Sequence, residues 1–281
     1  MSRTGIGAST YDFSGSVVLV TGAARGLGRS HALAFGECGA DVVAVDVAGD
    51  RAPVPYDLGS REQLDEVVEE IEREGARALA IEADVSDETE VEAAVEAALE
   101  EFGRIDVLAN NAGIASIVPA LDLDEEYWDD VLDTNLKGSW LCAKHAGQHM
   151  VDRGGGAIVN TSSATGLVGQ PGFAHYGSSK HGVIGLTKAL AIELAEHDVT
   201  VNAVCPTAVE TPMVPKVTEV FGSEQIEAVG RLAGPANLFG DEADQSIPPG
   251  AVSDAFLWLA SDAARYVTGV ALPVDAGFTV K

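Results

Sequence analysis

The fold is decided near the amino end of the sequence, by Val17-Val18-Leu19-Val20-Thr21 and the following Gly22-Ala23-Ala24-Arg25-Gly26-Leu27-Gly28. A short β-branched run stops at glycines and passes into a helical pattern, which is the context of a turn that binds nucleotide phosphates. Glycines let the backbone approach a pyrophosphate, and free N–H groups at the start of the helix favour its negative charge. The spacing is T-G-x-x-x-G-x-G rather than the common G-x-G-x-x-G. Because glycine turns also follow strands for purely steric reasons, the rest of the chain decides between the two interpretations.

Short apolar runs alternate with longer helical patterns along the chain, which is typical of a parallel sheet covered by helices. The runs predicted to be strands are residues 17–21, 41–46, 78–83, 105–110, 157–162, 199–205 and 270–274. Helices are predicted around residues 64–71, from Asp87 with its helix-start partner Glu90, and at about 125–151, 175–197 and 251–260. We therefore expect an α/β protein, with a single Rossmann-type doubly wound domain and a seven-stranded parallel sheet.

The domain organisation follows from this alternation, which no linker-like change of composition and no internal repeat interrupts. We expect residues 1–13 to form an N-terminal extension and residues 14–281 to form one dinucleotide-binding domain. Residues 47–60 and 207–250 break the rhythm after strands, at the sheet edge where open parallel sheets bind ligands. We expect residues 207–250 to be the substrate lid, with an inert surface excursion as the alternative. Its apolar residues, which line a pocket or pack the lid onto the body, are Met213, Val217, Val220 and Phe221.

Composition excludes several classes of protein. No apolar run reaches the ~18 residues needed to cross a bilayer, and residues 1–14 lack the basic and apolar parts of a signal peptide. We therefore expect a cytoplasmic protein. Cys38, Cys142 and Cys205 lie far apart in apolar patterns without neighbouring histidine clusters, so we expect buried thiols and no metal site.

The charge balance is strongly acidic. The chain carries 44 Asp and Glu against 17 Lys and Arg, a formal net charge of −27. Nucleic acids and anionic membranes are therefore poor partners. Acidic residues crowd the predicted helix faces, as expected for a halophilic protein in a salt-rich cytoplasm, where screening removes the self-repulsion. Ordinary solvated helix faces in an acidic protein are the alternative.

Asp46 bears on the choice of cofactor, because it ends the second predicted strand 24 residues after Gly22. This is close to the spacing at which a carboxylate accepts hydrogen bonds from an adenine ribose. A 2′-phosphate would bring a like charge next to Asp46, so the sequence favours NAD. Arg25 favours the opposite choice, since a guanidinium in the glycine turn can pair with a 2′-phosphate. We give Asp46 the greater weight.

A second group of residues points to proton transfer. Tyr176 and Lys180 are four residues apart in a predicted helix and therefore lie on one face. A nearby ammonium favours the phenolate of a tyrosine, whose unperturbed pKa near 10 otherwise makes it a poor base. Ser163 precedes Tyr176 by thirteen residues, at the end of the fifth predicted strand. Ser162 is the alternative if the register is off by one residue.

These motifs together resemble the short-chain dehydrogenase/reductase family over residues 14–281. The motifs that match in order are the glycine turn, Asp46, Ala83-Asp84-Val85, Asn110-Asn111-Ala112-Gly113, Thr134-Asn135, Asn160-Thr161-Ser162-Ser163, Tyr176 with Lys180, Asn202-Ala203-Val204-Cys205-Pro206 and Val274-Asp275-Ala276-Gly277. The resemblance implies an NAD-dependent oxidoreductase that interconverts a secondary alcohol and its ketone by hydride transfer.

The resemblance also implies residue roles. Tyr176 would be the acid/base, and Ser163 would hold the substrate oxygen. Lys180 would lower the pKa of Tyr176 and bind the nicotinamide ribose, and Asn135 would help to hold a water that relays protons. The residues that would bind the cofactor are Gly22, Arg25, Gly26, Leu27, Gly28, Asp46, Asp84, Val85, Asn111, Gly113, Tyr176, Lys180, Val209 and Thr211. The family usually has Pro-Gly where this chain has Pro206-Thr207, which affects the expected backbone path toward Val209 and Thr211.

A narrower resemblance is to the carveol dehydrogenase-like branch, which is often described as mycofactocin-coupled. It rests on Gly28-Arg29-Ser30-His31-Ala32, on Pro55-Tyr56-Asp57-Leu58 and on residues 258–277. It implies a cyclic or terpenoid alcohol as substrate and, in some members, a cofactor that does not readily exchange. Asn110 stands where that branch has alanine.

Two other functions stay open. A 3-oxoacyl or sugar-type reductase would use the same fold and the same acid/base. A dinucleotide sensor without turnover is disfavoured, because Asn135, Ser163, Tyr176 and Lys180 are all present. As in many members of the family, we expect a homotetramer, formed through the predicted helices 125–151 and 175–197 and the last strand. The expected partners are thus a small alcohol or ketone and further copies of the chain.

Overall fold

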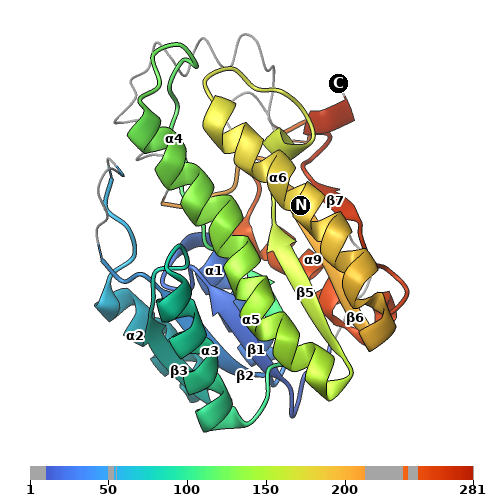
Figure 1. The fold of residues 1–281 in the computed structure, drawn as a ribbon. Helices are drawn as coiled ribbons and strands as arrows, with labels where there is room; N and C mark the ends of the chain where they lie inside the picture. The colour runs from blue at the N-terminus through green and yellow to red at the C-terminus, as the bar shows by residue number, and fades with distance from the viewer. Residues whose placement is uncertain (1–10, 50–53, 55, 213–236, 240–245, 281) are drawn as a thin grey trace.

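The computed structural model describes residues 11–49, 54, 56–212, 237–239 and 246–280. They form three layers, in which a parallel sheet lies between two sets of helices (Figure 1). The lid residues Met213, Val217, Val220 and Phe221 lie outside the described residues, as does most of the expected N-terminal extension.

The sheet has seven strands in the order β3-β2-β1-β4-β5-β6-β7. The strands are β1 (Val17–Thr21), β2 (Asp41–Asp46), β3 (Ala78–Glu82), β4 (Val107–Asn110), β5 (Gly156–Thr161), β6 (Val199–Pro206) and β7 (Ala271–Val274). All neighbouring strands pair in parallel. The predicted doubly wound sheet is therefore confirmed, with β1 and β2 as predicted and the ends of the other strands within two residues of the predicted ones.

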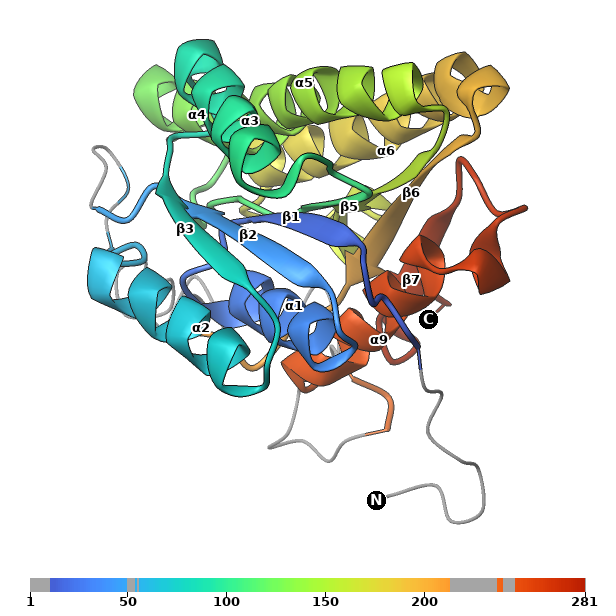
Figure 2. The ribbon, with the colours of Figure 1, turned by 90° about the horizontal axis from the view of Figure 1, so that it is seen from below.

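Helices cover both faces of the sheet, as Figure 2 shows. One face carries α1 (Gly26–Glu37), α2 (Arg61–Arg73) and α9 (Pro249–Ala260). The other carries α3 (Glu88–Phe102), α4 (Glu125–Leu132), α5 (Gly138–Arg153) and α6 (Ala174–Leu194). Because successive strand side chains alternate between faces, each face buries its own apolar cluster against its helices.

Two helix predictions need correction in detail. The predicted helix 125–151 is divided by a π-helical segment, Asp133–Lys137, between α4 and α5. At the start of α3, the Asp87 carboxylate accepts the N–H groups of Thr89 at 2.8 Å and Glu90 at 3.2 Å, as expected for a helix cap. In a capping box the Glu90 carboxylate would accept the N–H of Asp87. It instead accepts the N–H of Asp84 at 2.8 Å, three residues earlier in the chain.

Helix α1 is held in the core partly through aromatic contacts. His31 is fully buried and stacks on Phe256 of α9 with 3.9 Å between ring centroids. Its Nδ1 lies 2.8 Å from the hydroxyl of Ser253, and burial lowers the pKa of His31 to about 3. Phe13, which the sequence assigns to the extension, is also buried and packs edge to face with Phe35, with 5.0 Å between the two ring centroids. His31 is therefore a neutral packing residue.

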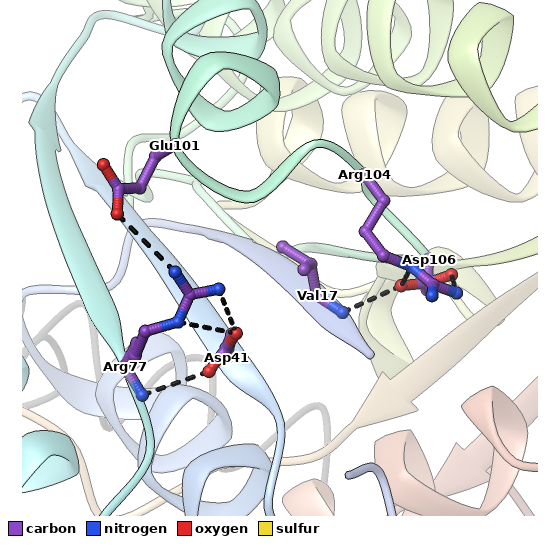
Figure 3. A network of polar contacts seen from close by, with 6 residues as sticks. All are labelled: Val17, Asp41, Arg77, Glu101, Arg104 and Asp106. Atoms are coloured by element: carbon purple, nitrogen blue, oxygen red, sulfur yellow. Dashed lines mark hydrogen bonds and ion pairs between the residues drawn. The ribbon is translucent and has the colours of Figure 1, made fainter. Parts of the chain in front are cut away.

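Carboxylates at the amino-terminal edge of the sheet tie its strands together (Figure 3). Asp106 precedes β4 and accepts the N–H of Val17 in β1 at 2.8 Å and the Nε–H of Arg104 at 2.7 Å. Arg153 donates to the same carboxylate at 2.7 Å. Burial alone would raise the pKa of Asp106, but these hydrogen bonds outweigh it and hold the pKa below its usual value. Asp41, at the start of β2, likewise binds Arg77, which directly precedes β3.

We predict that Asp106→Asn lowers the free energy of unfolding by about 2 kcal/mol, because a charge-assisted network around a mostly buried group is lost. Since the folded state lowers the pKa of Asp106, this stabilisation is present above the unfolded carboxyl pKa near 4 and is lost as pH falls through the folded pKa. Urea unfolding at neutral and acidic pH measures both effects.

Asp198→Asn is the control, since Asp198 pairs with Arg265 on the exposed surface. It should change the free energy of unfolding by less than about 1 kcal/mol. Equal losses in the two variants at neutral pH would contradict the role of the Asp106 network.

Candidate active site

A cleft lies where the order of the strands reverses. β1 and β4 are neighbours, with β2 and β3 on one side and β5, β6 and β7 on the other, and open sheets bind ligands at the carboxyl ends of such a pair. The cleft has a volume of about 470 Å³. Its wall includes the predicted residues Gly22, Arg25, Gly26, Leu27, Asp46, Asp84, Val85, Asn111, Gly113, Ser163, Tyr176, Lys180, Val209 and Thr211. Gly28 and Asn135 lie behind this wall and hold parts of it in position.

The glycine turn connects β1 to α1 and is tightly closed. A Cβ atom at Gly28 would lie 1.9 Å from the carbonyl oxygen of Gly22, so no other residue fits there. The N-cap residue Arg25 makes no side-chain cap, which leaves N–H groups of the first turn of α1 free for an anion. The turn therefore fits a pyrophosphate.

Asp46 and Arg25 differ in how they meet the cleft. The buried Asp46 carboxylate accepts the N–H of Ala24 at 3.0 Å and that of Ala48 at 3.2 Å, which fixes it at the end of β2. Gly59 packs against it so closely that a Cβ there would lie 3.0 Å from Asp46 Oδ1. Arg25 donates from Nη2 to the carbonyl oxygen of Asp57 at 2.6 Å. The fixed carboxylate and the confined space beside it fit an unphosphorylated ribose, and Arg25 is already engaged with the segment after β2.

β1 and β4 are joined at their carboxyl ends by side-chain hydrogen bonds. The Thr21 hydroxyl oxygen accepts the N–H groups of Asn111 at 2.9 Å and Ala112 at 3.0 Å. The Asn111 amide donates to the Thr21 carbonyl oxygen at 3.0 Å and accepts from Thr161 of β5 at 3.1 Å. Asn111 therefore fixes the floor of the cleft and also contributes to its wall.

Asn110, which differs from the alanine of the related branch, forms part of a buried amide network. Its side chain donates to the carbonyl oxygen of Ser139 at 2.8 Å and to the Asn160 side chain at 3.0 Å. Asn160 in turn donates to Thr187 of α6 at 3.0 Å. The departure is thus accommodated by partners in β5 and in two helices.

Three polar residues meet at the other end of the cleft. Lys180 is only 3% exposed, donates to the carbonyl oxygen of Thr161 at 2.8 Å, and has its Nζ 5.6 Å from the Tyr176 ring centroid. The Ser163 side chain faces Tyr176 closely enough to lower the pKa of its phenol, and its hydroxyl accepts the N–H of Thr165 at 3.1 Å. Ser162 donates instead to the Lys180 carbonyl oxygen at 2.9 Å. The geometry thus favours Ser163 over Ser162 as the partner of Tyr176.

The electrostatics of this group are dominated by desolvation. The surrounding protein raises the pKa of Tyr176, and the hydrogen bond from Ser163 opposes part of that rise. Burial lowers the pKa of Lys180 to about 8. The lowering of the Tyr176 pKa by Lys180, implied by the family resemblance, is therefore not the dominant effect in this structure. The physical reason is that the buried ammonium is itself destabilised and directs a hydrogen bond to Thr161.

Asn135 lies in the π-helical segment and is fully buried. Its side chain accepts the N–H of Ile114 at 2.8 Å and donates to the carbonyl oxygen of Ile114 at 2.9 Å. It also donates to the Ser179 hydroxyl at 3.1 Å. Asn135 therefore fixes the loop after β4, and its part in a proton relay stays a prediction.

The chain after Pro206 runs toward the glycine turn. Val209 is buried and pairs with Ile247, and Thr211 lies 3.5 Å from the position of a Cβ on Gly26. The N–H of Thr207, which stands where the family usually has glycine, donates to the carbonyl oxygen of Val274 at 3.3 Å, directly after the last paired residues of β6 and β7.

Several wall residues were not predicted from the sequence. They are Leu58, Gly59, Ala112, Ile114, Ala115, Ile117, Thr134, Gln170, Phe173 and Phe278, among others. Leu58 lies in the proline-bearing insertion, whose place after a strand end was a usable signal. Phe278 reaches the wall from the last turn of the described chain, and no local pattern could have indicated that contact.

The three cysteines are free, with Cys142 and Cys205 buried and Cys38 half-buried. Across the described ranges, no group of three or more histidine, cysteine or acidic side chains could hold a metal ion. Within the same part of the chain, no helix combines the length and apolar character needed to span a bilayer.

Comparison with known proteins agrees with this geometry. The family model of short chain dehydrogenases matches residues 16–220. A (−)-trans-carveol dehydrogenase from Rhodococcus erythropolis is 44% identical over 95% of this chain and 98% of its own length. A 3-oxoacyl-[acyl-carrier-protein] reductase from Staphylococcus aureus is 40% identical over 92% of this chain and 96% of its own length.

A solved structure of similar architecture is that of a carveol dehydrogenase from Mycobacterium avium in complex with NAD. It is 36% identical in sequence, covers 97% of this chain and 100% of its own, and has a TM-score of 0.88. With the glycine turn, the strand-end carboxylate and the Ser-Tyr-Lys group assembled in one cleft, the chain belongs to the short-chain dehydrogenase family.

Proposed function

We propose that this protein is an NAD-dependent dehydrogenase that interconverts a secondary alcohol and its ketone. The observation that carries the proposal is the arrangement of one cleft, with Asp46 and the glycine turn at one end and Ser163, Tyr176 and Lys180 at the other. The similar structure from Mycobacterium avium holds NAD, which supports the same choice here.

In this proposal Tyr176 moves the proton. During oxidation its phenolate takes the hydroxyl proton of the alcohol, and during reduction its phenol returns a proton to the carbonyl oxygen. Ser163, which lies beside Tyr176, orients the substrate oxygen, and Lys180 binds the nicotinamide ribose from its buried position. When bound, NAD supplies the hydride acceptor at nicotinamide C4. Asn135 acts one step away by fixing Ile114.

We propose a cyclic or terpenoid alcohol as the substrate. The wall near Tyr176 includes the Phe173 ring, which clusters with the apolar side chains of Ile117 and Leu58, and such a surface fits a hydrocarbon ring better than a polyol. The relative from Rhodococcus erythropolis acts on trans-carveol by its name. The alternative is a 3-oxoacyl or sugar-type reductase. The 3-oxoacyl reductase from Staphylococcus aureus, at 40% identity, supports this alternative.

The assigned role of Tyr176 can be tested by substitution. Tyr176→Phe should lower kcat for alcohol oxidation by about 10²- to 10⁴-fold, because the proton acceptor is lost while the ring stays. Reduced-nicotinamide absorbance is followed with NAD or NADP and a set of cyclic, terpenoid, acyclic and sugar alcohols. Dinucleotide affinity, measured by calorimetry, is the control and should change little. Unchanged turnover in the variant would reject Tyr176 as the acid/base. If neither the wild type nor the variant turns over any alcohol although both bind NAD, the dinucleotide sensor would be favoured.

The assigned preference for NAD can be tested at Asp46. Asp46→Asn keeps the shape of the side chain but removes the charge that faces the ribose site, so NAD should bind about tenfold more weakly. The ratio of NADP to NAD affinity should rise, since a 2′-phosphate no longer meets a like charge. Titration of both dinucleotides measures this. The reverse preference in the unmodified protein would contradict the assignment of NAD.

We also propose that the protein works as a homotetramer in a salt-rich cytoplasm. Trp128, Trp140 and Ile192 are exposed on the α4, α5 and α6 side, where a second copy could cover them. Acidic helix faces account for much of the net charge of −27. Sedimentation measures the assembly directly.

If self-repulsion is the dominant effect of this charge, the urea midpoint of unfolding should rise between about 0.1 M and about 2 M KCl. The same titration with an uncharged osmolyte separates charge screening from general solvent effects. A midpoint that does not change with KCl would support ordinary solvated helix faces.

A further inference from the structure

The loop after β4 is held to its surroundings residue by residue. The Asn135 side chain binds both backbone groups of Ile114, and the Ser116 hydroxyl is hydrogen-bonded to Nε2 of the buried His175. The N–H of Val118 donates to the carbonyl oxygen of Gly172 at 2.9 Å. Ala115 lies between these contacts, and its partner comes from the segment after β2.

That partner is Tyr56. Its hydroxyl accepts the N–H of Ala115 at 3.0 Å and donates to the carbonyl oxygen of the same residue at 2.9 Å. Tyr56 as a whole is 6% exposed, and it packs in a small apolar cluster with Ile117, Leu58 and Phe173. Tyr56 therefore connects the insertion after β2 to the loop after β4 through both polar and apolar contacts.

The same cluster reaches the acid/base. Ala115, Ile117 and Phe173 line the cleft, and Val118 pairs with Phe173 in a parallel bridge. The Phe173 ring meets the Tyr176 ring edge to face, with 5.7 Å between centroids. A shift of Ala115 and Ile117 would thus move the wall that faces Tyr176.

We propose that Tyr56 is a positioning residue, which sets the apolar wall at Ala115 and Ile117 relative to Tyr176 and thereby the fit of the alcohol. The proposal rests on the proposed function, since it assigns a residue outside the proton-transfer group to the same reaction. Tyr56 does not line the cleft among the described residues, so it acts through Ala115 and Ile117.

The hydroxyl of Tyr56 can keep this role in both protonation states of Tyr176. Burial raises the pKa of Tyr56 to about 12, and a negative charge on Tyr176 adds to the rise. The phenol therefore stays protonated and continues to donate to Ala115, so loss of the clamp through ionisation is avoided.

The chain offers a matched pair of variants. Tyr56→Phe removes only the hydroxyl and keeps the ring in its cluster. Thr268→Val is the control, because the Thr268 hydroxyl also binds both backbone groups of one residue, accepting the N–H of Val201 at 3.0 Å and donating to its carbonyl oxygen at 3.5 Å. Val201 lies near the start of β6, at the sheet edge opposite the cleft.

The two variants are compared by steady-state kinetics with the alcohol that the wild-type protein oxidises fastest. Tyr56→Phe should lower kcat/KM by about tenfold or more, with a raised KM and unchanged affinity for NAD, since a small misplacement of reacting groups is costly. Thr268→Val should leave kcat and KM within about twofold at a similar loss of thermal stability. Kinetics of Tyr56→Phe that match those of Thr268→Val would overturn the proposal.

Hydrogen exchange read by mass spectrometry tests the clamp without turnover. In Tyr56→Phe, the peptide that contains Ala115 should exchange faster, while the same peptide in Thr268→Val should not. If no alcohol reacts with the wild type, the proposed function fails, and this exchange experiment still decides whether Tyr56 positions the loop. Unchanged protection at Ala115 in Tyr56→Phe would overturn it.

Discussion

The site depends on the hydrogen bonds that join the carboxyl ends of β1 and β4. At this point the strand order reverses, so the helices after the two strands leave toward opposite faces and open a cleft between them. The Thr21 hydroxyl holds Asn111 and Ala112, and Asn111 returns a bond to Thr21. These bonds fix the distance between the glycine turn, which follows β1, and the loop that leads toward Tyr176.

Buried polar groups give the rest of the site its precision. Lys180 and Asn135 are both buried and hydrogen-bonded to carbonyl oxygens, an arrangement that costs desolvation but leaves each side chain one orientation. The burial of Lys180 also lowers its pKa to about 8, so its charge is sensitive to what occupies the cleft. Burial therefore both fixes the orientation of Lys180 and shifts its pKa.

The elements that could be predicted are those whose signal is local. β1 and β2 were predicted residue for residue, because β-branched runs end at Gly22 and at Asp46. The cap by Asp87 was predictable, whereas the reach of Glu90 to Asp84 depends on the path of the preceding loop. The contacts of Tyr56 with Ala115 join residues 59 positions apart, and nothing in either segment alone indicates the other. The cofactor end of the cleft was therefore more predictable than the substrate end.

This asymmetry has a physical cause that also bears on specificity. The cofactor end is formed by strand ends and by the start of α1, whose geometry follows from the parallel sheet itself. The substrate end is assembled from Leu58 of one insertion, Ile117 of the loop after β4 and Phe173 of the segment before α6. Side chains in such segments can change without disturbing a strand, because they contact the cleft rather than the sheet core. The proton-transfer group can therefore stay fixed while the surrounding wall is adapted to another alcohol, and the shape of the wall, rather than the fold, determines which ketone is formed.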